Sequence, residues 1–304
     1  MEFKKTTIKM PSSDNIHTLR GVIYIPQGEA KGVFHLVHGM CEHIGRYDRF
    51  MSTLAENGYI VAGYDNLGHG ASVNDDSELG FIAEKKGYNL LAEDVYNFGK
   101  KLRKNNKGLP FILMGHSMGS FIVRLAAAKH PEGIDKLIIC GTGGPNPASA
   151  AGLLLCDIIG LFKGKRSYSK FIYNMAFGKY NDGFEGRHNY EWLTKDQEEI
   201  EKHRVDPLCH FKFSVGGMHD LVKLNSLTNK SRYIKMLNPD MPILLISGSE
   251  DPVGEKGKGV EKVYVNYKKY GKNVTKKIYE NCRHEIHNDT CRDEMMADIL
   301  EFIK

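Results

Sequence analysis

Short apolar runs alternate with longer amphipathic stretches along most of this chain, and this rhythm most strongly constrains its fold. Strand-like runs, most of them apolar, recur at residues 32–38, 59–65, 110–115, 136–140, 242–247 and 274–279. Stretches with helical periodicity lie between or after them, at residues 46–57, 89–103, 119–129, 259–270 and 289–304. Because strands that alternate with helices usually pair in parallel, we predict an α/β domain with a mainly parallel sheet covered on both faces.

The rhythm is broken between residues 146 and 238, a segment rich in aromatic and charged residues whose pattern predicts helices with irregular connections. Two alternating segments at residues 4–10 and 17–25 open the chain and predict antiparallel edge strands. We therefore expect one α/β core formed by residues 1–145 and 239–304. A helical cap, residues 146–238, would be inserted after the sixth strand, which the length of 304 residues allows.

Charge and cysteine usage disfavour several function classes. The net charge is +5, and no basic motif with interleaved aromatic residues points to nucleic acid. The six cysteines lack C-x-x-C spacing, so we expect free thiols in a reducing, cytoplasmic setting. His284 and His287 are one residue too close for the H-E-x-x-H zinc motif, and no metal site is predicted. We expect neither a membrane span nor a secretory signal.

The strand-like run at residues 110–115 leads into Gly115-His116-Ser117-Met118-Gly119, and a helical stretch follows at once. This strand–turn–helix order is the context of the G-x-S-x-G nucleophile elbow. Its glycines let strand and helix approach closely, so that the Ser117 hydroxyl stands clear of the sheet on a strained turn. We predict Ser117 as a hydrolytic nucleophile; the alternative is a serine in an ordinary glycine-rich turn.

The partners of such a nucleophile follow it along the chain, each in a loop after a strand. Asp251 follows the run at residues 242–247, and His284 follows the run at residues 274–279. We predict that His284 takes the serine proton as general base and that Asp251 orients the imidazole. Glu250 is a rival for the acid role, and His287 is a rival for the base.

An oxyanion hole is predicted from two backbone amides. The elbow supplies the amide of the residue after the nucleophile, and a second amide comes from the loop after the third strand. His38-Gly39-Met40 closes that strand, so we predict the N–H groups of Met118 and Met40 as the donors. His38 itself is expected to be a packed loop histidine.

Together these segments resemble the monoacylglycerol lipase and lysophospholipase-like branch of the α/β hydrolases, which is also grouped with serine aminopeptidases. The resemblance covers nearly the whole chain, and its His-Gly-x-x-Glu-His segment is more specific than G-x-S-x-G. The matching positions are residues 38–47, 65–70, 115–119, 247–253 and 283–285, with residues 192–194 and 206–209 in the cap.

The resemblance implies the α/β-hydrolase fold and cofactor-free hydrolysis of carboxylesters, often of single-chain lipids, through an acyl-enzyme. It also implies that Glu42, His43 and Arg46 brace the oxyanion loop around His38 and Gly39. Ser120 is a departure, since many relatives carry glycine there, and it should not harm catalysis.

Substrate choice is expected to lie in the cap. Residues 152–162 are strongly apolar and are followed by Lys163, Lys165 and Arg166. They could form a lid helix that shields an acyl tunnel and touches membranes or micelles, or a helix packed on the core. Three other functions stay open: a short-chain or aryl esterase, an aminopeptidase that uses cap carboxylates, and a receptor-like binding module with slow hydrolysis. The pattern indicates neither acyl length nor oligomeric state.

Overall fold

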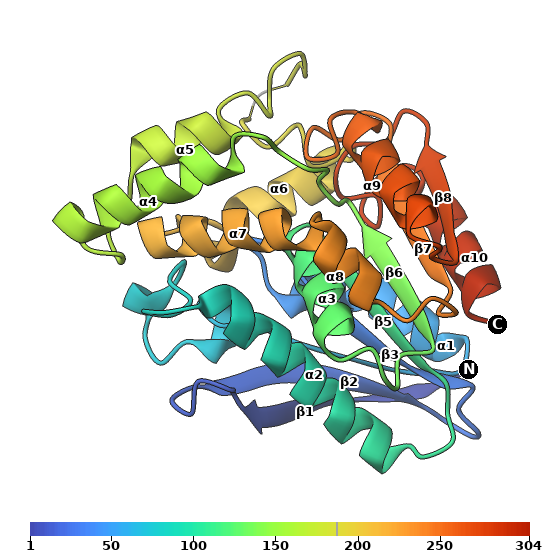
Figure 1. The fold of residues 1–304 in the computed structure, drawn as a ribbon. Helices are drawn as coiled ribbons and strands as arrows, with labels where there is room; N and C mark the ends of the chain where they lie inside the picture. Colours follow the sequence, from blue (N-terminus) through green and yellow to red (C-terminus); the bar gives the residue numbers. More distant parts are fainter. Residues whose placement is uncertain (187) are drawn as a thin grey trace.

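The computed structural model describes residues 1–186 and 188–304, and a mixed sheet forms its centre (Figure 1). The strand order is β1-β2-β4-β3-β5-β6-β7-β8. Strand β2 is antiparallel to both of its neighbours, β1 and β4, and the strands from β4 to β8 are parallel to one another. The strands are β1 (Phe3–Pro11), β2 (Thr18–Pro26), β3 (Gly32–Val37), β4 (Tyr59–Tyr64), β5 (Phe111–His116), β6 (Lys136–Cys140), β7 (Ile243–Gly248) and β8 (Val274–Tyr279). The predicted sheet and its antiparallel edge are confirmed.

Burial explains why the central strands are continuous apolar runs. Every residue of β3, β4, β5 and β7 is buried, whereas β1 at the edge is mostly exposed. Helices cover both faces of the sheet, as parallel strands require. On one face α2 (Gly87–Asn105), α3 (Met118–Lys129) and α9 (Lys258–Lys269) contribute to one apolar core; on the other, α1 (Asp48–Glu56) and α10 (Arg292–Ile303) contribute to a second.

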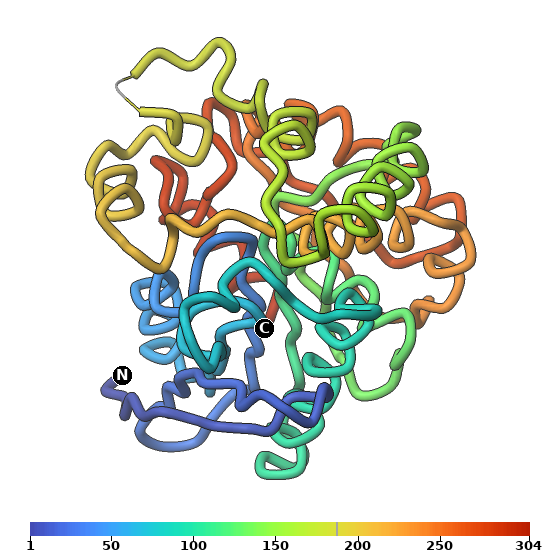
Figure 2. The backbone as a smooth tube through the Cα atoms, turned by 90° about the vertical axis from the view of Figure 1, so that its left-hand side faces the viewer, coloured from blue at the N-terminus to red at the C-terminus, as the bar shows by residue number. Residues whose placement is uncertain are grey.

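The chain between β6 and β7 forms the cap, as predicted, and Figure 2 shows it at the opposite end of the molecule from the blue N-terminal hairpin. Its helices are α4 (Ser149–Lys163), α5 (Lys170–Phe177), α6 (Gln197–Val205), α7 (Val215–Thr228) and α8 (Ser231–Met236). Short 3-10 turns are η1 (Ile44–Tyr47), η2 (Gly70–Ser72), η3 (Asp76–Glu78) and η4 (Pro207–Cys209). Among the described residues, none of the helices has both the length and the apolarity to span a membrane.

The cap helices differ in how they pack. Met218 and Leu224 of α7 and Ile234 of α8 join the core that α3 builds, so the end of the insertion rests on the main domain. By contrast, α4 buries only Ser149 and Cys156, although its sequence is strongly apolar. The domain limits at residues 146 and 238 remain predictions.

Candidate active site

Ser117 lies on the turn that joins β5 to α3. Its backbone has φ 54° and ψ −121°, a conformation that costs a non-glycine residue roughly 1–3 kcal/mol. The flanking residues must be glycines because a side chain at either position would clash with the backbone. A Cβ on Gly115 would lie 2.2 Å from the Gly119 carbonyl oxygen, and a Cβ on Gly119 would lie 2.1 Å from the Val37 carbonyl oxygen. The turn is held by a 3.0 Å hydrogen bond from the Ser117 N–H to the Cys140 carbonyl.

Asp251 and His284 come together from the loops after β7 and β8. His284 Nδ1 lies 2.9 Å from Asp251 Oδ1, and both side chains are buried. Asp251 also accepts hydrogen bonds from the Val253 N–H at 2.8 Å and the Ser247 hydroxyl at 3.0 Å. Burial raises the pKa of the Asp251 carboxyl, but the His284 charge and these hydrogen bonds outweigh it, so the pKa lies below its ordinary value. The side chain is therefore a carboxylate at neutral pH.

The two rival residues have other environments. Glu250 is part-exposed and pairs with Lys195 of the cap, with 3.0 Å between Oε1 and Nζ. His287 is buried and stacks on Tyr47 with 4.4 Å between ring centroids, and burial lowers its pKa to about 3. Neither lines the cavity described below, so the geometry favours Asp251 and His284.

A cavity of about 1140 Å³ lies between the cap and the core domain, and Ser117, His284, Met40 and Met118 all line it. The loop after β3 packs directly on the nucleophile turn: a Cβ on Gly39 would come within 2.9 Å of the Ser117 Cβ. The predicted nucleophile, base and oxyanion-loop residues are thus gathered at one wall.

A buried ionic network braces this oxyanion loop. Glu42 accepts hydrogen bonds from the Gly39 N–H at 2.5 Å and from the Tyr47 hydroxyl at 2.8 Å. The Arg46 guanidinium lies between two carboxylates. It donates one hydrogen bond of 3.1 Å to Glu42 and two hydrogen bonds of 2.6 and 2.7 Å to Glu285. Burial raises the pKa of Glu285, but the Arg46 guanidinium outweighs it and holds that pKa below its ordinary range. The network connects the oxyanion loop to the residue that follows His284.

His38 also holds the oxyanion loop in place through hydrogen bonds of its side chain. Its Nδ1–H donates to the Gly39 carbonyl at 2.8 Å, and its Nε2 accepts the Asn66 N–H at 2.9 Å. Both ring nitrogens are therefore used, and the side chain is buried and does not line the cavity. This is the packed loop histidine that the sequence leads us to expect.

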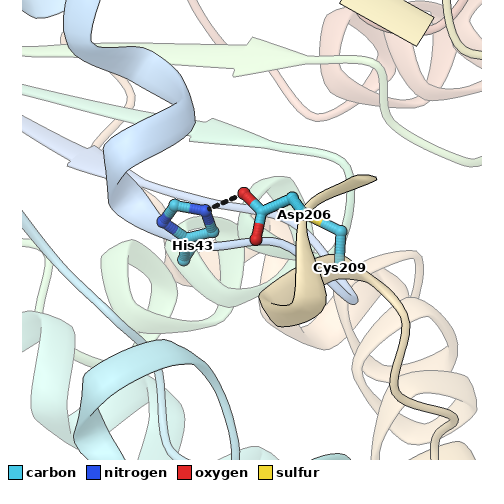
Figure 3. Close-up of side chains that lie close together, drawn as sticks. All are labelled: His43, Asp206 and Cys209. Carbon is cyan, nitrogen blue, oxygen red and sulfur yellow. Dashed lines mark hydrogen bonds and ion pairs between the residues drawn. The ribbon is translucent and has the colours of Figure 1, made fainter. Parts of the chain in front are cut away.

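His43 connects the oxyanion loop to the cap (Figure 3). Its Nε2 lies 2.8 Å from Asp206 Oδ2, and Asp206 also caps η4 by accepting the Leu208 N–H. With Cys209 these side chains place three possible ligand atoms within 4.8 Å of one another. However, Cys209 lies beside the Arg46 charge, which opposes a cation, and burial raises the pKa of its thiol. The hydrogen bond between His43 and Asp206 explains why these side chains lie together, and it connects the cap to the core domain.

Comparison with known proteins places this arrangement in a family. The family model described as serine aminopeptidase S33 matches residues 28–291. This chain belongs to that family of α/β hydrolases. It is 26% identical to human monoglyceride lipase over 268 residues, which cover 87% of this chain and 78% of the relative. It is 25% identical to a monoglyceride lipase homolog of monkeypox virus over 276 residues, which cover 90% of this chain and 88% of the relative.

A solved carboxyl esterase from Bacillus coagulans, in complex with glycerol, is similar throughout. The TM-score is 0.91 at 30% identity, with 98% of this chain and 97% of that chain covered. These similarities confirm the predicted family and fold. This α/β hydrolase is therefore esterase- and lipase-like.

Several residues around the site lie in segments that carry the family resemblance, but no role was predicted for them from the sequence. Trp192, the only tryptophan of this hydrolase, reaches from the cap to His284, with ring centroids 5.1 Å apart. Arg283 donates to the carbonyls of Glu191 at 2.6 Å and Thr194 at 2.9 Å, so it anchors the cap segment beside the His284 loop. The sequence signals that could have indicated these contacts are the single tryptophan in the cap and the arginine directly before His284.

His116, inside the elbow, was also missed. Its Nδ1 contacts the Tyr47 hydroxyl at 2.8 Å, and its Nε2 lies 3.2 Å from the His284 carbonyl oxygen. Burial lowers its pKa, but Glu42 outweighs burial and raises the pKa above the ordinary value. His116 therefore connects the elbow, the oxyanion-loop network and the His284 loop.

Replacing Arg46 with methionine is expected to lower the free energy of unfolding by about 3–5 kcal/mol, because Glu42 and Glu285 would keep buried charges without their partner. The matched control is Arg49→Met, which removes an exposed ion pair with Asp293 and should cost less than about 1 kcal/mol. Urea unfolding of both variants checks this. Equal losses would contradict a structural role for the network.

Proposed function

We propose that this protein is a serine carboxylester hydrolase that acts on monoacylglycerols, lysophospholipids or similar lipid esters. The observation that carries the proposal is the 2.9 Å contact of Asp251 with His284, a residue that lines the same large cavity as Ser117. The names of the human and viral relatives and of the bacterial esterase support it.

In the proposed reaction the Ser117 hydroxyl attacks the ester carbonyl while His284 takes its proton, then returns it to the leaving alcohol. Asp251 keeps the proton on Nδ1, so Nε2 is free to act as the base, and stabilises the imidazolium. The amides of Met40 and Met118 would hold the developing oxyanion. Water then releases the acyl group from Ser117 by the same route.

The cavity supports a substrate with an acyl chain. Its volume of about 1140 Å³ exceeds the roughly 300–1,000 Å³ of usual ligand pockets. The surface that lines it is mainly apolar, and large apolar side chains of the core and the cap contribute to it: Phe121, Leu155, Phe177, Met218, Leu221 and Val222. Each methylene buried there could contribute up to about 0.8 kcal/mol, or about fourfold in kcat/KM.

The cap carboxylates do not favour the aminopeptidase alternative. None of Glu185, Glu191, Asp196, Glu198 and Glu199 lines the cavity. Asp196 instead caps α6 and pairs with Arg292 at 2.6 Å, and Glu199 pairs with Lys202 at 2.9 Å. A substrate amine at Ser117 would therefore lack these carboxylates as partners.

Hydrolysis of p-nitrophenyl esters of increasing acyl length, with 1-monoacylglycerols and an aminoacyl anilide alongside, tests the function. We expect kcat/KM to rise toward medium or long chains, because methylenes fill the apolar cavity. Highest activity on acetyl esters would favour the short-chain esterase, and cleavage of the anilide alone would favour the aminopeptidase. No turnover of any ester would favour the binding module.

We further propose that α4 and α5 contact membranes or micelles that present the substrate. These helices project past the end of the sheet in Figure 1 and expose large apolar side chains, with Leu161 and Phe162 each 81% exposed. Lys163, Lys165 and Arg166 follow directly, a pattern suited to an anionic lipid surface.

Replacing both Leu161 and Phe162 with serine is therefore expected to weaken binding to anionic phospholipid vesicles at least tenfold, as measured by co-sedimentation. Hydrolysis of a soluble short ester should stay within about twofold, since neither side chain lines the cavity. The control is Ile16→Ser, an exposed residue between β1 and β2 and thus outside the cap. Equal vesicle binding by both variants would refute the contact.

A further inference from the structure

A short cap segment, residues 192–195, lies along the loop that carries His284. The two backbones are joined directly, because the His284 N–H donates to the Trp192 carbonyl at 3.3 Å and the Glu285 N–H donates to the Leu193 carbonyl at 2.7 Å. The cap therefore contacts the loop of the proposed base through its main chain, which fixes where the Trp192 side chain begins.

The rest of this segment is bound to the same loop. The Thr194 hydroxyl donates to the Asn288 carbonyl at 2.9 Å, and the Lys195 N–H donates to an Asp289 carboxylate oxygen at 3.1 Å. Arg283 adds its hydrogen bond to the Thr194 carbonyl. With so many bonds between them, the cap segment and the His284 loop are held as one unit.

The Trp192 indole lies against the His284 imidazole. The ring centroids are 5.1 Å apart and the ring planes differ by 36°, which is closer to parallel than to perpendicular. Two rings at this distance and tilt overlap in an offset stack. On its other contact the indole meets Tyr180, with 5.2 Å between centroids. Trp192 and His284 both line the cavity that Ser117 lines, so the ring pair lies at the proposed reaction centre.

The other groups that face His284 differ in their effect on a positive imidazole. The Asp251 carboxylate, at 2.9 Å from Nδ1, favours the charge. His116 lies on the elbow with 4.7 Å between ring centroids, and it opposes that charge whenever it carries a proton itself. The loop after β6 presents Gly141, which has no side chain. The indole of Trp192 is the aromatic surface that the cap adds to this set.

We propose that Trp192 is a positioning residue that the cap supplies to the active site, where its indole holds the His284 ring and stabilises the imidazolium formed during hydrolysis. A cation within about 6 Å of an aromatic centroid is attracted by the negative charge of the ring face, most strongly by that of tryptophan. The role in hydrolysis rests on the proposed function, whereas the preference for a charged His284 does not.

The cation exists only while a proton is in transit. The proton leaves the Ser117 hydroxyl as its oxygen bonds to the ester carbon, stays on His284 Nε2, and passes to the leaving alcohol when the ester bond breaks. An interaction that strengthens when this charge appears lowers the barrier without tightening the binding of the neutral substrate. Loss of the indole should therefore lower kcat more than it raises KM.

Two variants of Trp192 test this role with a soluble short-chain p-nitrophenyl ester. Trp192→Leu keeps an apolar side chain without an aromatic face, and we expect kcat to fall roughly three- to thirtyfold, the range of a cation–π contact. The value of KM should stay within about twofold, because substrate binding does not involve the charge. Trp192→Phe restores a smaller ring face and should recover most of the lost kcat.

The pH profile separates this role from simple packing. The acid limb of kcat/KM reports protonation of the base in the free enzyme. Without the indole the imidazolium is less stable, so the acid limb of Trp192→Leu should move to lower pH by roughly half a unit or more. The matched control is Phe184→Leu, a cap aromatic that packs on Arg283, with 4.6 Å from its ring centroid to Cζ, and does not line the cavity. Its kcat and its acid limb should match those of the wild type.

NMR titration of the histidine rings reads the same protonation without turnover. Ser117→Ala is compared with Ser117→Ala/Trp192→Leu, and His284→Gln identifies the His284 signal and separates it from that of His116. A lower titration midpoint without the indole supports the proposal, and equal midpoints would overturn it even if no ester is hydrolysed. In the active enzyme, an unmoved acid limb or an undiminished kcat in Trp192→Leu would also overturn it. If Trp192→Leu does not fold, Trp192→Phe carries the same comparisons with smaller shifts.

Discussion

Replacing Ser117 with alanine is expected to lower kcat for ester hydrolysis by roughly 10⁴- to 10⁶-fold, the range typical of a lost serine nucleophile. The reason is that no other hydroxyl occupies the strained turn between β5 and α3, where the side chain meets the cavity and the oxyanion loop. The melting temperature should change little, because alanine tolerates the same backbone conformation about as well as serine. Steady-state kinetics with a p-nitrophenyl ester check the prediction.

The matched control for this variant is Ser149→Ala, which removes a second serine that lines the same cavity. Its kcat should stay within about threefold of the wild type, because Ser149 begins α4 in the cap and lies outside the elbow and the loops that carry Asp251 and His284. A comparable loss of kcat in both variants would mean that activity depends on the shape of the cavity and not on the Ser117 hydroxyl. Undiminished activity in Ser117→Ala would refute the assignment of the nucleophile.

Replacing Asp251 with asparagine is expected to lower kcat by roughly 10³- to 10⁴-fold. Asparagine has the same size, but its amide can donate to His284 Nδ1, which would place the imidazole proton on the wrong nitrogen. The control Glu250→Gln changes the neighbouring acid, which pairs with Lys195, and should alter kcat only a few-fold. If Glu250→Gln had the larger effect, the roles of the two acids would be reversed.

The same variant has a pH signature. The folded-state pKa of Asp251 lies below the ordinary value of 3.8, so its carboxylate stabilises the fold above that pH. This contribution is lost as the pH falls through the folded-state pKa. The difference in unfolding free energy between wild type and Asp251→Asn should therefore be widest above about pH 4 and should narrow in acid. A difference that grows on acidification would contradict the low pKa.

The sheet and the placement of the site could be predicted because their signals are local. A buried parallel strand is a short apolar run, and each of β3 to β7 is one or nearly so, whereas β8 lies at the sheet edge and is partly exposed. The nucleophile and acid candidates follow such runs, the histidine candidate follows β8, and parallel strands bring their carboxyl ends to one edge of the sheet. Motif order along the chain therefore predicted proximity in space.

Contacts between the cap and the core could not be predicted in the same way. The bonds from His43 to Asp206 and from Arg283 to the Glu191 carbonyl join segments far apart in sequence, and no periodicity marks them. The apolar residues 152–162 were ambiguous for a related reason. An apolar helix has the same pattern whether it packs on a core or faces lipid, and only the fold reveals that α4 is largely exposed.

The most direct test of the central claim is to trap the nucleophile with a p-nitrophenyl phosphonate that carries an alkyl chain, then locate the adduct by mass spectrometry. We expect one phosphonyl group on Ser117, complete loss of esterase activity in proportion to labelling, and no labelling of Ser117→Ala. Two results would contradict the assignment of this protein as a Ser117-dependent hydrolase. One is esterase activity that survives full labelling of Ser117, and the other is inactivation that correlates only with an adduct on a different residue.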